Sequence, residues 1–306
     1  IVMLHDMAQQ HGNWPNIWKR EPWNIYDIGI LPGPAWEERW QQSVTHPFVH
    51  PRLGVIRGGW PKADRILNNE EKKSKEELKL KFGLTKKIVI LYAPSWEYCN
   101  KQDEFVQALM HLDVDLILKQ APWSQEYNFV LENIKLMNDK HINIASNVHI
   151  ISPEENIFDC IKVADIMVSD ESSVMFEGLL LNVPAVAVTD WMIPDVKPAR
   201  LPSIPYDFVI KTKKACLQST VKMVLENLEE YRQMLQKNKE SNFYSIDNSS
   251  VQIMNAIDSV VNNGYCDFIV PKTDSRIIPL NDILRRKYIV MRRTVGRILR
   301  KFHLLG

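Results

Sequence analysis

After Gly83 the chain alternates short apolar segments with amphipathic ones, and this alternation constrains the fold more than any other feature of the sequence. The segment Lys87–Tyr92 is almost continuously apolar, as expected of a strand buried on both faces of a sheet. Later strands are expected at Asp115–Lys119, Val148–Ile151, Ala164–Ser169, Ala185–Val188 and Asp207–Ile210. The accompanying helices are expected at Asp103–Leu112, Asn128–Asn138, Ile157–Ala164, Val174–Leu181, Lys214–Asn238 and Val251–Val261. Strands that alternate with helices in this way form right-handed βαβ units, so the sequence predicts an α/β domain with a doubly wound parallel sheet.

The first 66 residues differ from the rest, because they are rich in tryptophan, proline, glycine and histidine. Strand-like segments at Ile1–Leu4, Asp27–Leu31 and Gly54–Ile56 end in turn residues, and a proline is well placed to start a helix over Ala35–Gln42. The chain begins with isoleucine rather than methionine, and no signal-peptide pattern precedes the first strand. We interpret the sequence as one that lacks the N-terminal part of its protein.

A highly charged run at residues 68–81 is typical of a solvent-exposed helix and is a natural join between two domains. We therefore predict four parts. They are a partial first domain at residues 1–66, a charged linker or helix at 67–82, a complete α/β domain at 83–265 and a basic amphipathic tail at 266–306.

The overall composition is that of an ordinary globular protein, with 38 basic residues, 37 acidic residues and 45% hydrophobic residues. It excludes a disordered or collagen-like chain, and no apolar run is long enough to predict a membrane-spanning helix. Four cysteines lie about fifty residues apart, and they are Cys99, Cys160, Cys216 and Cys266. This spacing suits neither zinc nor a dense disulfide framework, so we expect four buried thiols in a reducing cytoplasm.

The near-neutral total conceals a basic tail, since residues from Asn281 to the end include eight basic residues and one acidic residue. Apolar residues recur there at helical spacing, namely Leu284, Tyr288, Met291, Val295, Ile298, Phe302 and Leu305. Such a helix is typical of one lying on an anionic membrane surface. A C-terminal helix that braces two domains has the same pattern, so this alternative stays open. Because no nucleic-acid motif is present, binding to nucleic acid is not expected.

Small polar residues follow the strand that ends at Ser169, and a helix begins just after them. In a doubly wound sheet, ligands bind beyond the carboxyl ends of the strands. Ser172 and Ser173 are placed to cap the helix and to leave backbone N–H groups for a phosphate, with Asp170 before them and Glu177 one turn later. We predict a nucleotide site here; the alternative is ordinary helix capping with a solvent-facing glutamate.

Two more loops are expected to reach the same edge of the sheet. One carries Ser95 and Trp96, and the other carries Lys119 and Trp123. They would supply a hydroxyl, a cation and a flat surface for a base or sugar, although each tryptophan taken alone is also explained by packing.

Histidines near the first strand are candidates for an acid–base role. His5 and Asp6 follow that strand directly, and His11 comes six residues later. A histidine beside a carboxylate titrates in the range needed to accept a proton near neutral pH. The spacing does not match a metal site, so none is predicted.

The sequence lacks the glycine-rich motifs of NAD-binding and P-loop proteins and the Gly-x-Ser-x-Gly of α/β-hydrolases. A nucleotide held by serines at a helix start is instead consistent with the transfer of a nucleotide-activated group.

Several segments, in this order, resemble the CDP-glycerol glycerophosphotransferase family, the teichoic-acid primases and polymerases of bacterial surfaces. They are the strand ending in His5, Gly58–Asp64, Ile90–Trp96, Asp165–Ser173 and Phe176–Pro184. The resemblance implies a GT-B fold, in which residues 1–66 are the end of an acceptor-side domain and the α/β domain binds the donor. Ser95, Trp96, Lys119, Ser169, Asp170, Ser172, Ser173 and Glu177 would then contact the donor, and Trp60, Lys62 and Asp64 would face the acceptor.

By the same resemblance, His5 would deprotonate the acceptor hydroxyl, with Asp6 and His11 as the other catalytic candidates. The chain departs from the family at two places. Asp6 replaces a glycine after the histidine, and Gln120-Ala121-Pro122 stands where the family has a His-Pro pair.

The sequence therefore predicts a transferase that moves glycerol phosphate, or a similar polyol phosphate, from a CDP-activated donor to a lipid-linked cell-envelope polymer. It needs no cofactor and would lie on the cytoplasmic face of the membrane. The alternatives are a nucleotide-sugar glycosyltransferase for capsule or lipopolysaccharide, and a non-catalytic member that binds a nucleotide or glycan.

Overall fold

The computed structural model describes residues 1–8, 17–44, 46–67, 73–244 and 248–271, together with residues 284, 287, 288, 291, 292 and 295. His11 and most of the predicted tail lie outside these residues. Within the described part, no helix is long and apolar enough to cross a bilayer.

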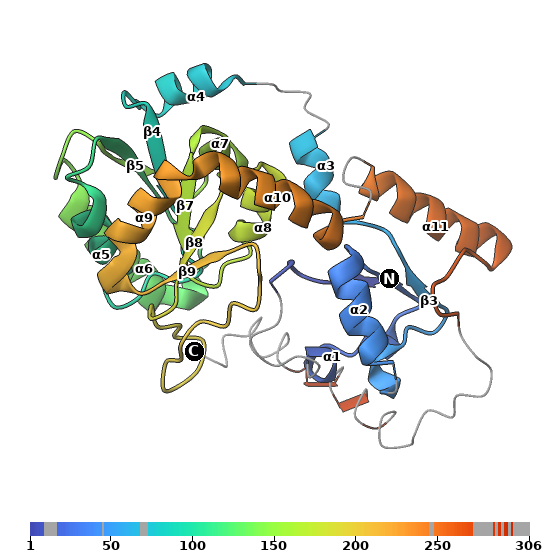
Figure 1. Ribbon diagram of the computed structural model, residues 1–306. Helices are drawn as coiled ribbons and strands as arrows, with labels where there is room; N and C mark the ends of the chain where they lie inside the picture. The colour runs from blue at the N-terminus through green and yellow to red at the C-terminus, as the bar shows by residue number, and fades with distance from the viewer. Residues whose placement is uncertain are drawn as a thin grey trace.

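The protein contains two parallel sheets, which confirms the predicted α/β class (Figure 1). The first has the order β1-β2-β3 and the second has the order β6-β5-β4-β7-β8-β9. The strands of the first sheet are β1 (Val2–Met3), β2 (Ile28–Ile30) and β3 (Gly54–Ile56). Those of the second are β4 (Ile88–Tyr92), β5 (Val114–Lys119), β6 (Val148–Ile151), β7 (Ile166–Ser169), β8 (Ala185–Val188) and β9 (Ile210–Thr212).

The second sheet is doubly wound because both of its faces are covered by helices. Along β4, Val89 and Leu91 point into one hydrophobic cluster, whereas Ile90 and Tyr92 point into another. The continuous apolar pattern of this strand therefore reflects burial on both faces. The covering helices are α5 (Lys101–Leu109), α6 (Asn128–His141), α7 (Ile157–Val163), α8 (Val174–Leu180) and α9 (Leu217–Glu226).

The first sheet packs against an aromatic core. Trp18 lies edge-on to Trp23 and Trp36, with ring centroids 6.0 and 6.2 Å apart. Trp36 and Trp40 lie on the buried face of α2 (Pro34–Gln42), which begins at the proline as predicted. The short helices α1 (Ile17–Arg20), η1 (Trp23–Ile25) and η2 (Pro47–Val49) complete this unit.

The prediction of a single helix at Lys214–Asn238 is wrong. The structure has three elements there, η4 (Lys214–Cys216), α9 and α10 (Leu228–Asn242). Between α9 and α10, the Asn227 side chain donates a hydrogen bond of 2.8 Å to the carbonyl of Met223. An asparagine that bonds to its own preceding turn competes with the helical backbone. After this break, α10 runs from the second sheet to the first unit, where it contacts α2 (Figure 1).

The last described helix, α11 (Ser249–Asn263), lies beside the first sheet, although the predicted second domain extended to residue 265. Ile253 of α11 shares a cluster with Ile28, Ile30 and Ile56. The helix is fixed at its start by Asp64 of α3 (Pro61–Leu67), whose carboxylate accepts hydrogen bonds from the first two amides of α11, at 2.8 and 2.6 Å. Asp64 is thus a helix-capping residue that joins distant parts of the chain.

The predicted charged helix is shorter than expected within the described residues. It is α4 (Lys75–Lys81), and Ser74 and Glu77 form a capping box at its start. The cysteine prediction is partly wrong. Cys160 and Cys266 are buried, whereas Cys99 and Cys216 are exposed, because they lie in a surface loop and in a short surface turn, η4.

Glu37 of α2 ties the segment after α10 to the first unit. Its carboxylate accepts hydrogen bonds from Arg57 at 2.7 and 2.8 Å and from the Tyr244 hydroxyl at 2.6 Å. The bonds from Arg57 outweigh the effect of burial and lower the pKa of Glu37 from its ordinary value of 4.5.

We expect this carboxylate to make the protein less stable in acid. Because the folded-state pKa of Glu37 is lowered, its contribution is present above the unfolded value and is lost as the pH falls through the folded value. Glu37→Gln should therefore lower the urea midpoint at about pH 7 and reduce its further fall towards about pH 4. The control is Glu38→Gln, at an exposed position of the same helix. Equal pH dependence in the two variants would contradict the prediction.

Candidate active site

The carboxyl ends of β4 and β7 are neighbours, and the loops that follow them are joined by hydrogen bonds. The amide of Ser95 donates to Asp170 Oδ1 at 2.8 Å, and the hydroxyl of Ser169 donates to the carbonyl of Ala93 at 2.7 Å. The structure therefore brings together Ser95, Ser169 and Asp170, which the sequence analysis had assigned to one edge. Ser169 is fully buried and serves to join the loops.

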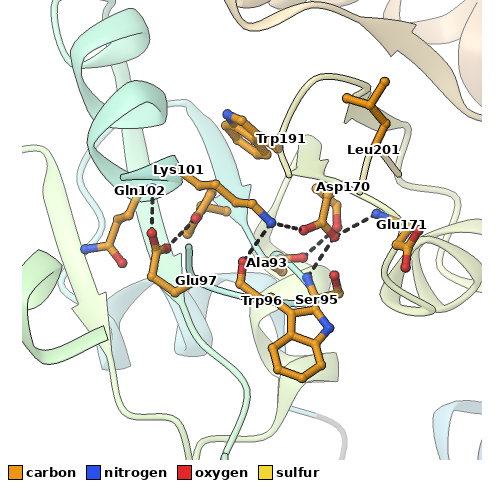
Figure 2. Close-up of polar contacts among 12 residues, drawn as sticks. Ala93, Ser95, Trp96, Glu97, Lys101, Gln102, Asp170, Glu171, Trp191 and Leu201 are labelled. Atoms are coloured by element: carbon orange, nitrogen blue, oxygen red, sulfur yellow. Dashed lines mark hydrogen bonds and ion pairs between the residues drawn. The ribbon is translucent and has the colours of Figure 1, made fainter. Parts of the chain in front are cut away.

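Asp170 is fully buried and forms an ion pair with Lys101, the first residue of α5 (Figure 2). Lys101 Nζ lies 2.7 Å from Asp170 Oδ2 and donates a second hydrogen bond, of 2.8 Å, to the carbonyl of Trp96. Burial alone would raise the pKa of Asp170, but the charge of Lys101 and the bonds to Lys101 and Ser95 outweigh burial and lower it below 3.8. The sequence analysis had missed Lys101, since no pattern separates it from the surface lysines.

Glu97 is a second buried carboxyl group in the same loop. It accepts hydrogen bonds from the Tyr92 hydroxyl at 2.6 Å and from the Gln120 amide at 2.9 Å. Burial raises the pKa of Glu97 above 4.5, although these bonds oppose the shift. Gln120 therefore links the end of β5 to the loop after β4.

Lys119, the last residue of β5, was predicted to offer a cation to the donor. The structure buries it and directs its Nζ to the carbonyls of Gln120 and Pro153, at 2.9 and 2.7 Å. Burial lowers the pKa of Lys119. In this arrangement the lysine joins the loops after β5 and β6.

Helix α8 begins at Val174, immediately after the two serines predicted to cap it. Ser172 Oγ accepts a hydrogen bond of 3.4 Å from the amide of Val174, whereas Ser173 makes no side-chain cap bond. Both serines lie at the edge where the loops after β4 and β7 meet.

Glu177 of α8 points into the protein rather than into solvent. It is 2% exposed and pairs with Lys62 of α3, which comes from the first unit. Burial raises the pKa of Glu177, although the Lys62 charge opposes this and the charge of Asp6 adds to it. The pair joins the first unit to the second sheet and its covering helices, which form the second unit.

His5 and Asp6 follow β1 directly and interact with each other. His5 Nδ1 lies 3.1 Å from Asp6 Oδ2, and Asp6 Oδ1 accepts a hydrogen bond of 2.8 Å from the amide of Ala8. The His5 side chain is 85% exposed. Burial raises the pKa values of Glu177 and Tyr206, and the nearby charge of Asp6 adds to both shifts, so Asp6 lies near these two residues.

Trp60, predicted to face the acceptor, is buried and stacks on Phe243 with ring centroids 5.9 Å apart. Lys62 Nζ lies 5.7 Å from the Trp60 ring centroid, so this tryptophan flanks the Lys62–Glu177 pair. Trp60 and Lys62 therefore lie at the junction of the units, whereas Asp64 caps α11.

Trp96 and Trp123 form an aromatic cluster beside the candidate site, with ring centroids 4.3 Å apart. Tyr127, just before α6, and Phe129, in its first turn, extend it and are 39% and 43% exposed. η3 (Gln125–Tyr127) carries the tyrosine. The cluster presents flat apolar surfaces close to Ser95.

Arg200 is another residue that the sequence analysis had missed. Its guanidinium donates a hydrogen bond of 2.7 Å to the carboxylate of Glu171, in the loop after β7. It also donates two hydrogen bonds, of 2.9 and 2.8 Å, to the carboxylate of Asp195. The amide of Ser203 donates to Glu171 at 2.8 Å. These bonds hold the long loop after β8 against the site. Among the described residues, no cluster of metal-ligating side chains occurs.

Comparisons with known proteins identify the family of the chain. A family model for CDP-glycerol:poly(glycerophosphate) glycerophosphotransferase matches residues 26–259. No curated protein sequence is significantly similar to the chain.

Among solved structures, the wall teichoic acid polymerase TagF is 18% identical, with a TM-score of 0.51, over 78% of this chain and 59% of that one. The UDP complex of S. aureus MnaA is 16% identical, with a TM-score of 0.55, over 84% and 67% of the two chains. The chain thus spans about three fifths of the polymerase, and these likenesses show that its fold is GT-B-like. Because the family model matches well over half of its residues, the chain belongs to the CDP-glycerol:poly(glycerophosphate) glycerophosphotransferase family.

Proposed function

We propose that the protein transfers glycerol phosphate, or a similar polyol phosphate, from a CDP-activated donor to a cell-envelope polymer of the teichoic acid type. The observation that supports this most strongly is the junction of the two units, where Lys62 of the first pairs with the buried Glu177 of the second, and where the nearby Asp6 carries His5 as its hydrogen-bond partner. A proton acceptor on one unit then faces a nucleotide edge on the other, as a transfer between two substrates requires.

In the proposed reaction, His5 accepts the proton of the acceptor hydroxyl. With Nδ1 donating a hydrogen bond to the Asp6 carboxylate, Nε2 is the proposed proton acceptor. The hydroxyl oxygen forms a bond to the phosphorus that carries the glycerol, the bond from that phosphorus to the bridging oxygen breaks, and CMP leaves. Ser95, Trp96, Ser172, Ser173 and Glu177 are the proposed donor contacts. The activated donor is itself the substrate, so the proposal includes no cofactor.

Titration of the intact protein with CDP-glycerol, CMP and UDP-sugars, paired with a turnover assay, tests the function. We expect binding of CDP-glycerol and CMP together with release of CMP in the presence of acceptor. Preference for UDP-sugars with sugar transfer would instead indicate a glycosyltransferase. Binding without turnover would indicate a non-catalytic member, consistent with Gln120 in place of the family's histidine region.

We also propose that the basic tail binds the cytoplasmic face of the membrane, where a lipid-linked acceptor would lie. Four described residues of the tail follow helical spacing, and their exposed fractions lie between 46% and 58%; they are Leu284, Tyr288, Met291 and Val295. An exposed apolar stripe beside arginines suits an interface with anionic lipid.

Flotation with liposomes that contain about 30% anionic lipid tests the tail, because each nearby basic residue adds roughly 1 kcal/mol to binding. We expect the intact protein to float and a variant lacking residues 281–306 to remain in the lower fraction. Neutral liposomes are the control. Equal flotation of both proteins would contradict the membrane proposal and favour a bracing role for the tail.

A further inference from the structure

Both oxygens of the Asp170 carboxylate accept hydrogen bonds from groups of the protein itself. Oδ1 accepts hydrogen bonds from the backbone amides of Ser95 and Glu171, at 2.8 and 2.7 Å, and Oδ2 forms the ion pair with Lys101 (Figure 2). Lys101 in turn holds the carbonyl of Trp96. One buried ion pair, anchored at the start of α5, therefore bonds backbone groups of both the loop after β4 and the loop after β7.

Stability alone is a poor explanation for this pair. The side chains of Lys101 and Asp170 are 1% and 0% exposed, so both charges have lost their hydration. Replacing a buried ion pair by well-packed apolar residues is often neutral or stabilising, because desolvation offsets the attraction of the charges. A buried pair with several backbone partners is better explained by the single conformation that it selects.

The loop between β4 and α5 needs such a constraint. Two consecutive residues just before Lys101 adopt left-handed backbone conformations, Cys99 with φ of 52° and Asn100 with φ of 63°. Non-glycine residues in this region cost energy, and they persist only where the surrounding structure imposes them. The bond from Lys101 to Trp96 and the bonds from Tyr92 and Gln120 to Glu97 act on the same loop.

We infer that Lys101 and Asp170 are a pair of positioning residues that hold the loop 93–100 against the turn 171–173 in the arrangement needed by the CDP-activated donor. The inference rests on the proposed function for the identity of the donor. It moves Asp170 from the set of donor contacts to a supporting role, since its oxygens already serve the backbone. Ser95 and Trp96 on one side, and Ser172 and Ser173 on the other, are the residues that the pair places.

The test compares Asp170→Asn with Asp115→Asn. Asp115 is also fully buried and accepts two amides, those of Thr85 and Lys86, at 2.7 and 2.6 Å. It lies near the start of β5, at the opposite edge of the sheet. The control therefore removes a buried carboxylate of similar environment without touching the candidate site.

Amide hydrogen exchange is measured first, without any ligand. We expect Asp170→Asn to accelerate exchange in residues 93–100 by at least about tenfold, while Asp115→Asn leaves this segment unchanged. In the donor titration, Asp170→Asn should weaken CDP-glycerol binding by about 10- to 100-fold, the scale of effect that misplaced contacts produce. If Asp170→Asn does not fold, Lys101→Met/Asp170→Asn removes both charges and carries the same expectations.

The exchange result decides the inference independently of the donor. Unchanged exchange in residues 93–100, or equal acceleration in both variants, would overturn the positioning role. Accelerated exchange with unchanged donor affinity would also overturn it, because the loop would then not serve binding. If the wild-type protein binds no CDP-glycerol, the proposed function fails, and the positioning of the loop is still judged by exchange.

Discussion

Replacing His5 by alanine is expected to abolish transfer while leaving donor binding intact. General-base catalysis contributes about 10²- to 10⁴-fold to a rate, so the turnover number should fall by a factor in that range. His5 belongs to the first unit, whereas the proposed donor contacts lie on the second, so the dissociation constant for CDP-glycerol should change by less than about twofold, under 0.5 kcal/mol. Turnover is measured as CMP release with saturating acceptor, and binding is measured by titration calorimetry.

His111→Ala is the matched control, because His111 is an exposed histidine near the opposite end of the second sheet. It should leave both the rate and the affinity unchanged. Parallel loss of transfer and donor binding in His5→Ala would refute the role of His5 as the base. In that case His5 would be a binding residue, and His11 would become the next candidate.

Gly33→Ala is expected to be the most destabilising small substitution in the first unit. A Cβ atom at Gly33 would lie 1.9 Å from the carbonyl oxygen of Asn242 and 2.6 Å from the amide nitrogen of Phe243. Both are backbone atoms at the end of α10, so a change of side-chain rotamer cannot relieve the clash. Overpacking usually costs about 1–3 kcal/mol, and we expect a value at or above the top of this range. Urea unfolding measures it.

Gly264→Ala provides the contrast. Gly264 follows α11 with φ of 70°, and nothing lies within 4 Å of the position its Cβ would take. The cost there is conformational only, about 1–2 kcal/mol. If Gly33→Ala were no more destabilising than Gly264→Ala, α10 would not be packed tightly against the first unit. Gly33→Ala should also slow transfer, since it displaces the unit that carries His5.

The elements that the sequence predicted well are those whose pattern is set by local burial. The β4 strand is apolar at every position because both faces are covered, and the helix after Gly33 begins with a proline that suits its first turn. The loops after β4 and β7 were correctly placed together, since adjacent parallel strands end at one edge of the sheet.

The parts that the sequence did not predict depend on pairing between distant residues. Lys101 and Arg200 look like surface cations in the sequence, and only the folded chain brings them to Asp170 and Glu171. Lys119 shows the reverse, because a cation predicted to face a ligand instead binds carbonyls of its own protein. A sequence shows which residues carry a charge, but it does not show which groups those charges contact in the folded protein.

The capping of α11 by Asp64 has a consequence for how members of this family can diverge. Helix α11 packs against the first sheet, although its first residue, Ser249, lies 185 positions after Asp64 in the chain. Recombination that replaced only the N-terminal half would leave the first amides of α11 without the Asp64 carboxylate and the apolar face of α11 without the sheet against which it packs. The first unit is therefore encoded by two distant stretches of gene, and a chimera that exchanges this unit must carry both.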